Sequence, residues 1–96
     1  MSWASRAIEE LKNGNETQVK PRGHSMKPRV KDGQVVTLCP CKPEDLVMDS
    51  VVLVKVRGNV YLHEIKAIDG NRFLIGNHRG HVNGWVGANC IYGKMK

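Results

Sequence analysis

Residues 51–65, VVLVKVRGNVYLHEI, contain two strand patterns joined by a tight turn. The first, residues 51–56, is a nearly continuous run of β-branched and aliphatic side chains, which is typical of a buried strand. Arg57-Gly58-Asn59 predicts the turn, and residues 60–68 then alternate in polarity as a strand does. The stretch therefore indicates a β-rich fold.

Shorter strand patterns lie on both sides of this stretch. They cover residues 34–38 (QVVTL), 72–75 (RFLI), 85–86 and 91–94 (IYGK). Asp69-Gly70 is a hairpin signal, and Asn83-Gly84 predicts another turn. Several short strands at this spacing predict a mainly β fold, built as a sandwich or a barrel-like sheet.

One short helix is expected at the N-terminus, over residues 2–13. Ser2 or Ser5 can cap it, and Gly14 follows as a stop signal. Its apolar face combines Trp3, Ala4, Ala7, Ile8 and Leu11. A helix of about three turns is not stable alone in water, so it is expected to dock on the rest of the protein. We expect a single domain over residues 1–96, with the helix in 1–14 and a β domain in 18–96.

The chain is basic, with a formal charge of +6 and a pI near 9.5. Such a surplus favours acidic partners. Residues 20–31 hold five cations and no acid, which reads either as a solvated loop or as a basic collar around Ser25. Nucleic acid ranks last among the partners, because the aromatic residues are not interleaved with the basic run as a stacking platform requires.

The three cysteines are Cys39, Cys41 and Cys90, and an odd number is typical of free thiols in a reducing compartment. No apolar run approaches the roughly 20 residues of a transmembrane helix, and the N-terminus lacks a signal-peptide pattern, so we expect a cytoplasmic protein. Cys39 and Cys41 with His78 and His81 could form a metal site. Their C-x-C spacing favours structural thiols instead, and no metal or cofactor is expected.

Residues 23–28, GHSMKP, form a polar loop in which Ser25 can be exposed. A serine needs an adjacent base to act as a nucleophile, and His63 is a candidate. Alternation places His63 on the core face of its strand with Tyr61 and Ile65, and Glu64 and Lys66 on the solvent face. On this pattern alone His63 is either a buried structural histidine or a catalytic base, and His78 and His81 are expected in solvent.

The GHSMKP loop, Gly33 and the strands at 49–56 (DSVVLVKV) and 60–65 (VYLHEI) resemble the superfamily of signal peptidases and SOS-type repressor self-cleavage domains. The resemblance covers residues 18–94. It implies a twisted, partly coiled antiparallel sheet and a polypeptide substrate. It also implies Ser25 as nucleophile and His63 as base, as in the archaeal and endoplasmic-reticulum enzymes. Gly23, His24, Ser25 and Met26 would form the site loop with the oxyanion hole.

In the family's His-type members an aspartate after the base strand supports the histidine. Asn77 stands at that position here, where it can orient His63 without stabilising its charge as a carboxylate does. Whether Asp32, Asp49 or Asp69 takes that part stays open.

Two functions are therefore expected. One is a soluble serine endopeptidase whose activity rises through about pH 6–7 as His63 loses its proton. The other is a catalytically silent binding module, bacterial or phage-encoded, that contacts an acidic protein through Arg22, Lys27 and Arg29.

Overall fold

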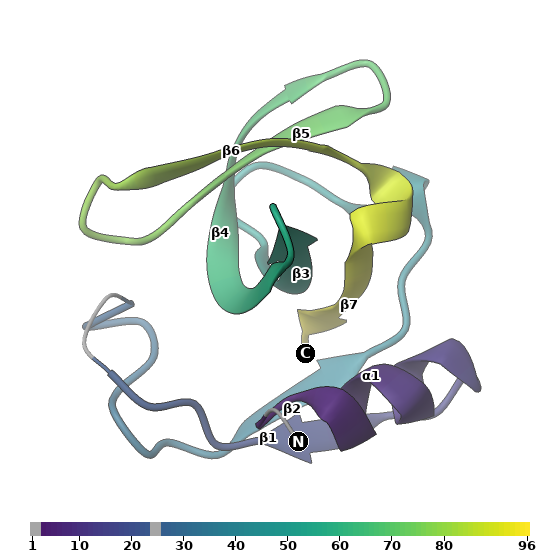
Figure 1. Ribbon diagram of the computed structural model, residues 1–96, viewed down its shortest axis with the longest axis vertical. Helices are drawn as coiled ribbons and strands as arrows, with labels where there is room; N and C mark the ends of the chain where they lie inside the picture. Colours follow the sequence, from purple (N-terminus) through teal and green to yellow (C-terminus); the bar gives the residue numbers. More distant parts are fainter. Residues whose placement is uncertain (1–2, 24–25) are drawn as a thin grey trace.

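The computed structural model describes residues 3–23 and 26–96, which form a seven-stranded antiparallel sheet curled into a half-barrel, with one short helix (Figure 1). The order of the strands in the sheet is β1-β2-β7-β3-β4-β5-β6. The elements are α1 (Ser5–Lys12), β1 (Thr17–Val19), β2 (Val36–Cys39), β3 (Val51–Val56), β4 (Asn59–Asp69), β5 (Arg72–Gly76), β6 (Val82–Gly87) and β7 (Ile91–Met95), with 3-10 turns at Pro43–Asp45 and Ala88–Cys90.

The mainly β class and the N-terminal helix are thus confirmed. β3 has the predicted bounds, and β4 is one residue longer at each end. The turn between them holds Arg57 and Gly58 at φ of 50° and 83°, which a two-residue hairpin of right-handed twist requires. β1 was not predicted, because three residues are too few to show a period.

Strand β3 lies between two hydrophobic clusters. Val51 and Leu53 belong to the first cluster, and Val52, Val54 and Val56 belong to the second. Both faces of the strand are covered except at the exposed Lys55, which explains its nearly continuous apolar sequence. The first cluster also receives α1 through its buried side chains Ala7 and Leu11, so the predicted docking of the helix is confirmed. Trp3 precedes α1 and is 49% exposed.

The prediction of a turn at Asn83-Gly84 is wrong. Both residues lie inside β6, and the β5–β6 connection is formed by residues 77–81. Gly76 pairs with Val82 and Ile75 pairs with Gly84, so Asn83 is an extra residue in the ladder. Such a β-bulge redirects a side chain, and Gly84 supplies the positive φ of 139° that this backbone needs.

The prediction that Glu64 faces solvent is also wrong, since Glu64 is 2% exposed. Alternation correctly separates Leu62 and Glu64 from His63, but both faces of β4 are covered in this part of the strand. The side chains over Glu64 come from the β1–β2 connection and from residues 77–81. These segments are distant in sequence, so a pattern local to the strand does not reveal them.

The β1–β2 connection, residues 20–35, contains the predicted site loop and is fixed at several points. The Asp32 carboxylate accepts a hydrogen bond from the Gly23 N–H at 2.7 Å, and the Gly33 N–H donates to the Pro21 carbonyl at 2.9 Å. Met26 and Val30 are buried in the first cluster. The described parts of the connection, residues 20–23 and 26–35, therefore have a defined position beside β4. Within the described chain, no helix has the length and apolar character needed to cross a membrane.

Candidate functional site

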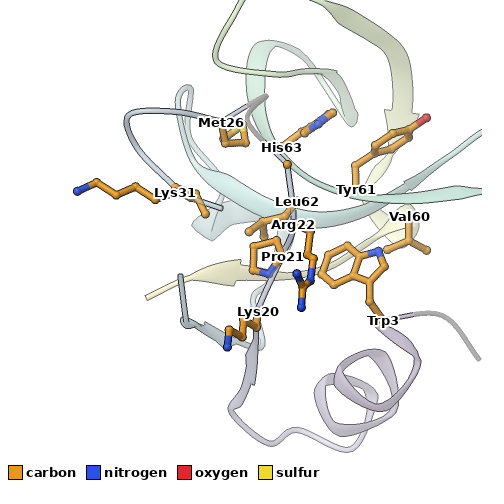
Figure 2. A pocket seen from close by; sticks show the side chains of 12 residues that line it. Trp3, Lys20, Pro21, Arg22, Met26, Lys31, Val60, Tyr61, Leu62 and His63 are labelled. Carbon is orange, nitrogen blue, oxygen red and sulfur yellow. The ribbon is translucent and has the colours of Figure 1, made fainter. Parts of the chain in front are cut away.

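A cavity of about 380 Å³ lies between the β1–β2 connection and β4. Figure 2 shows His63 and Met26 at one end of it, with Trp3 and Lys20 toward the other. Four pieces of chain contribute: the segment before α1, the start of the β1–β2 connection, its middle, and the first half of β4. The lining residues are Trp3, Lys20, Pro21, Arg22, Gly23, Met26, Val30, Lys31, Val60, Tyr61, Leu62 and His63.

His63 is 7% exposed and borders this cavity. Its ring stacks on Tyr61, with the ring centroids 4.8 Å apart and the planes at 22°. Its Nδ1 lies 2.7 Å from Oδ1 of Asn83. Because an amide oxygen only accepts hydrogen bonds, Nδ1 carries the proton in this arrangement, and the lone pair of the neutral ring is on Nε2.

Burial lowers the pKa of His63 below its usual 6.5, and the hydrogen bond with Asn83 opposes that shift only in part. The imidazole is therefore neutral at pH 7. A neutral, oriented imidazole at the wall of a cavity has the properties required of a general base.

The sequence suggested that Asn77 orients His63. In the structure the orienting side chain is that of Asn83. The Asn77 Oδ1 accepts hydrogen bonds from the N–H groups of Arg79 and His81, at 2.9 and 3.0 Å, and so closes the β5–β6 turn. Asn83 reaches His63 because the bulge in β6 turns it inward. A bulge depends on the pairing of two strands, so the sequence of β6 alone offered no signal for this contact.

The predicted site loop is described in part. Gly23 and Met26 both line the cavity with His63. The predicted nucleophile Ser25 and the neighbouring His24 lie outside the described residues. The expected pairing of Ser25 with His63 therefore stays a prediction.

The sequence left open whether one of three aspartates supports His63, and the structure gives the contacts or position of each. Asp32 accepts the hydrogen bond from Gly23. Asp49 has a φ of 71°, and its N–H donates to the Ile65 carbonyl at 2.8 Å. Asp69 is exposed at the far end of β4.

Arg29 differs from the other two predicted contact residues, because its charge is already neutralised inside the protein. Its Nη1 lies 2.8 Å from Oε2 of Glu64 and 2.6 Å from the Asp49 carbonyl. Arg22 lines the cavity and is exposed, whereas Lys27 is exposed but is not among the lining residues. Arg29 is thus engaged in an internal ion pair, and its part in the expected basic contact surface stays a prediction.

Glu64 is the centre of an ion cluster that the sequence analysis missed. Besides Arg29, its carboxylate receives Nζ of Lys66 at 2.7 Å and Nδ1 of His78 at 2.8 Å. Burial by itself would raise the pKa of Glu64, but these three hydrogen bonds outweigh it and hold the pKa at about 2. The prediction that His78 is merely solvated is corrected, since its ring contacts a buried carboxylate. The cluster joins β4 to the β1–β2 connection, which lines the cavity, and to the β5–β6 turn.

The cysteines show no sign of a metal centre. Cys39, Cys41 and Cys90 are free and half-buried, and burial raises the pKa of the Cys41 thiol. Among residues 3–23 and 26–96, no group of three or more His, Cys, Asp or Glu side chains is placed to hold a metal ion.

Comparison with known proteins identifies no relative, since no family model, curated protein or solved structure matches this chain.

Proposed function

We propose that this protein is a serine peptidase in which His63 is the general base and Ser25 the nucleophile. The observation that carries the proposal is the state of His63: buried, neutral, fixed through Nδ1 by Asn83, and bordering a cavity. Gly23 and Met26 support it further, because these lining residues are the described neighbours of the His24-Ser25 pair in the chain.

In the proposed reaction, Nε2 of His63 takes the proton of the Ser25 hydroxyl as its oxygen attacks the peptide carbonyl. The same nitrogen then protonates the leaving amine, and an acyl-enzyme forms. Water attacks this ester with His63 again as the base, which releases the acid and restores the hydroxyl. We assign the oxyanion hole to the backbone N–H of Ser25, as the family resemblance implies. Asn83 holds the ring in its tautomer but adds no negative charge.

The test is a mass-spectrometric cleavage assay on a diverse peptide library. Wild type is expected to yield products that are absent with Ser25→Ala and with His63→Ala. His81→Ala is the control histidine, because it is exposed and does not line the cavity. Its charge contributes to the lowered pKa of His63, so this variant is expected to keep cleavage and to shift only the pH midpoint. Cleavage that persists in Ser25→Ala would refute the dyad. If the samples match from pH 6 to 9, the fold is a binding scaffold and not an enzyme.

The pH profile provides a second readout. Because burial lowers the pKa of His63, activity is expected to rise with pH through a midpoint below 6.5. Asn83→Asp places a carboxylate against Nδ1, which favours the charged ring and moves the midpoint to higher pH. An unchanged midpoint in that variant would show that the group being titrated is not His63. We also propose that the protein is cytoplasmic, as its free cysteines lead us to expect.

A further inference from the structure

The walls of the cavity combine two kinds of surface. Trp3, Pro21, Met26 and Leu62 present apolar groups, and three cations, Lys20, Arg22 and Lys31, come from the start and the middle of the β1–β2 connection. None of the described lining residues is acidic. An occupant with both an apolar side chain and a negative charge would complement this lining.

Among the residues that the structure describes, the three cations have no ion-pair partner, unlike Arg29. Within the described chain, the ion pairs are those of Glu64 with Arg29, Lys66 and His78, and that of Lys96 with Glu16. Lys20, Arg22 and Lys31 are exposed and take part in none of them. Figure 2 shows the Arg22 side chain between Pro21 and Trp3, with Lys20 and Lys31 extending outward.

Trp3 forms an apolar wall that the core does not require. Trp3 is 49% exposed, although the next residue, Ala4, is fully buried. An exposed tryptophan beside a cavity is a ready contact for an incoming chain, since burying the ring removes a large apolar area from water.

We propose that the cavity binds a peptide segment that carries both apolar and acidic residues, the apolar side chains against Trp3 and Leu62 and the carboxylates against Lys20, Arg22 and Lys31. This inference names the substrate class of the site and rests on the proposed function.

The test measures binding without cleavage, on the full chain carrying Ser25→Ala and Trp85→Phe. Trp3 is then the only tryptophan. The probe is acetyl-Leu-Glu-Leu-Glu-amide, compared with its lysine counterpart, acetyl-Leu-Lys-Leu-Lys-amide, and its serine counterpart, acetyl-Ser-Glu-Ser-Glu-amide. Calorimetry gives the affinity, and the emission of Trp3 reports whether the peptide reaches the cavity.

We expect the Leu-Glu peptide to bind most tightly and to shift the emission of Trp3 to shorter wavelength. Its affinity should fall as salt rises from about 0.1 M to 1 M, because the charges are exposed and therefore screened. Joint replacement of Lys20, Arg22 and Lys31 by glutamine should weaken binding about tenfold, since each exposed ion pair changes an equilibrium constant only a few-fold.

The matched control replaces Lys42, Lys55 and Arg72 by glutamine. These residues are also exposed, and the formal charge falls from +6 by the same three units, but none of them lines the cavity. This triple variant should bind almost as wild type does. If both triple variants bound the peptide equally weakly, the loss of affinity would come from net charge alone, and the proposal would be overturned.

The remaining outcomes are equally decisive. No binding, equal binding of the lysine or serine peptide, or binding without a change in Trp3 emission each overturns the inference. Failure of the peptidase proposal looks different: the Leu-Glu peptide binds, but wild type cleaves nothing. Conversely, cleavage confined to neutral or basic peptides would support the peptidase and refute this substrate class.

Discussion

Glu64 shows how much one buried side chain can connect. Its carboxylate joins β4, through Arg29, to the connection that carries the site loop, and through His78 to the β5–β6 turn. It is adjacent in sequence to His63, whose side chain leaves the strand on the opposite face. A change at Glu64 is therefore expected to affect both stability and the shape of the cavity.

Glu64→Gln tests the cluster through pH. The folded-state pKa of about 2 lies below the ordinary 4.5, so the stabilisation is complete above about pH 4.5 and is lost as pH falls toward 2. A shift of this size corresponds to about 3 kcal/mol. The variant should be less stable than wild type at pH 7 by about that amount and should lose this acid dependence.

Urea unfolding between pH 2 and pH 7 measures both effects. Glu16→Gln is the control, because that carboxylate is 52% exposed and its ion pair with Lys96 is 3.3 Å long. Such exposed pairs contribute about 0–1 kcal/mol. If Glu64→Gln behaved like Glu16→Gln, the cluster would not stabilise the fold.

At the scale of elements, a glycine allows the helix to pack close to the sheet. A methyl group on Gly93 of β7 would lie 2.7 Å from the Cys39 carbonyl oxygen and 2.8 Å from Cδ2 of Leu11 in α1. Both distances are shorter than van der Waals contact, and one of the atoms is backbone. Gly93 therefore allows α1 and β2 to approach β7 together.

Gly93→Ala is expected to lower the free energy of unfolding by about 1–3 kcal/mol, because the chain must shift to make room. Gly87→Ala is the matched control: its new methyl group would meet the Asn89 side chain at 3.1 Å, and that side chain can rotate away. Urea unfolding of the two variants gives the comparison. Equal stability would mean that α1 is not tightly packed on β7.

At the scale of the whole molecule, β3 makes the two hydrophobic clusters parts of one structure. Leu53 fills the first cluster and Val52 the second, and both are fully buried. Loss of either cluster exposes one face of the same strand, so the protein is expected to unfold in a single step.

Two single-tryptophan variants test this. Trp85→Phe leaves Trp3, which lines the cavity with residues of the first cluster, and Trp3→Phe leaves Trp85 on β6, next in sequence to Val86 of the second cluster. In each variant the curve from tryptophan emission should coincide with the curve from circular dichroism, and Leu53→Ala should lower the stability of both variants by the same amount, about 2–5 kcal/mol. A transition seen by Trp85 alone would show that the β5–β6 end melts separately.

The parts of this protein that its sequence predicted are those governed by local chemistry. The run at 51–56, the Arg57-Gly58 turn and the apolar face of the N-terminal helix each depend on neighbouring residues, so β3, β4 and α1 could be read directly. Alternation placed His63 on a covered face of its strand, but its choice as the candidate base came from the family resemblance, and that role stays a prediction.

Only the tertiary structure decided what surrounds those elements. Asn83 is the partner of His63 because a bulge between β5 and β6 turns it inward, and Glu64 is buried because two distant connections cover it. The cavity likewise combines four separated pieces of chain. Periodicity tells which face of a strand a side chain takes, but what covers that face depends on contacts between residues far apart in the sequence.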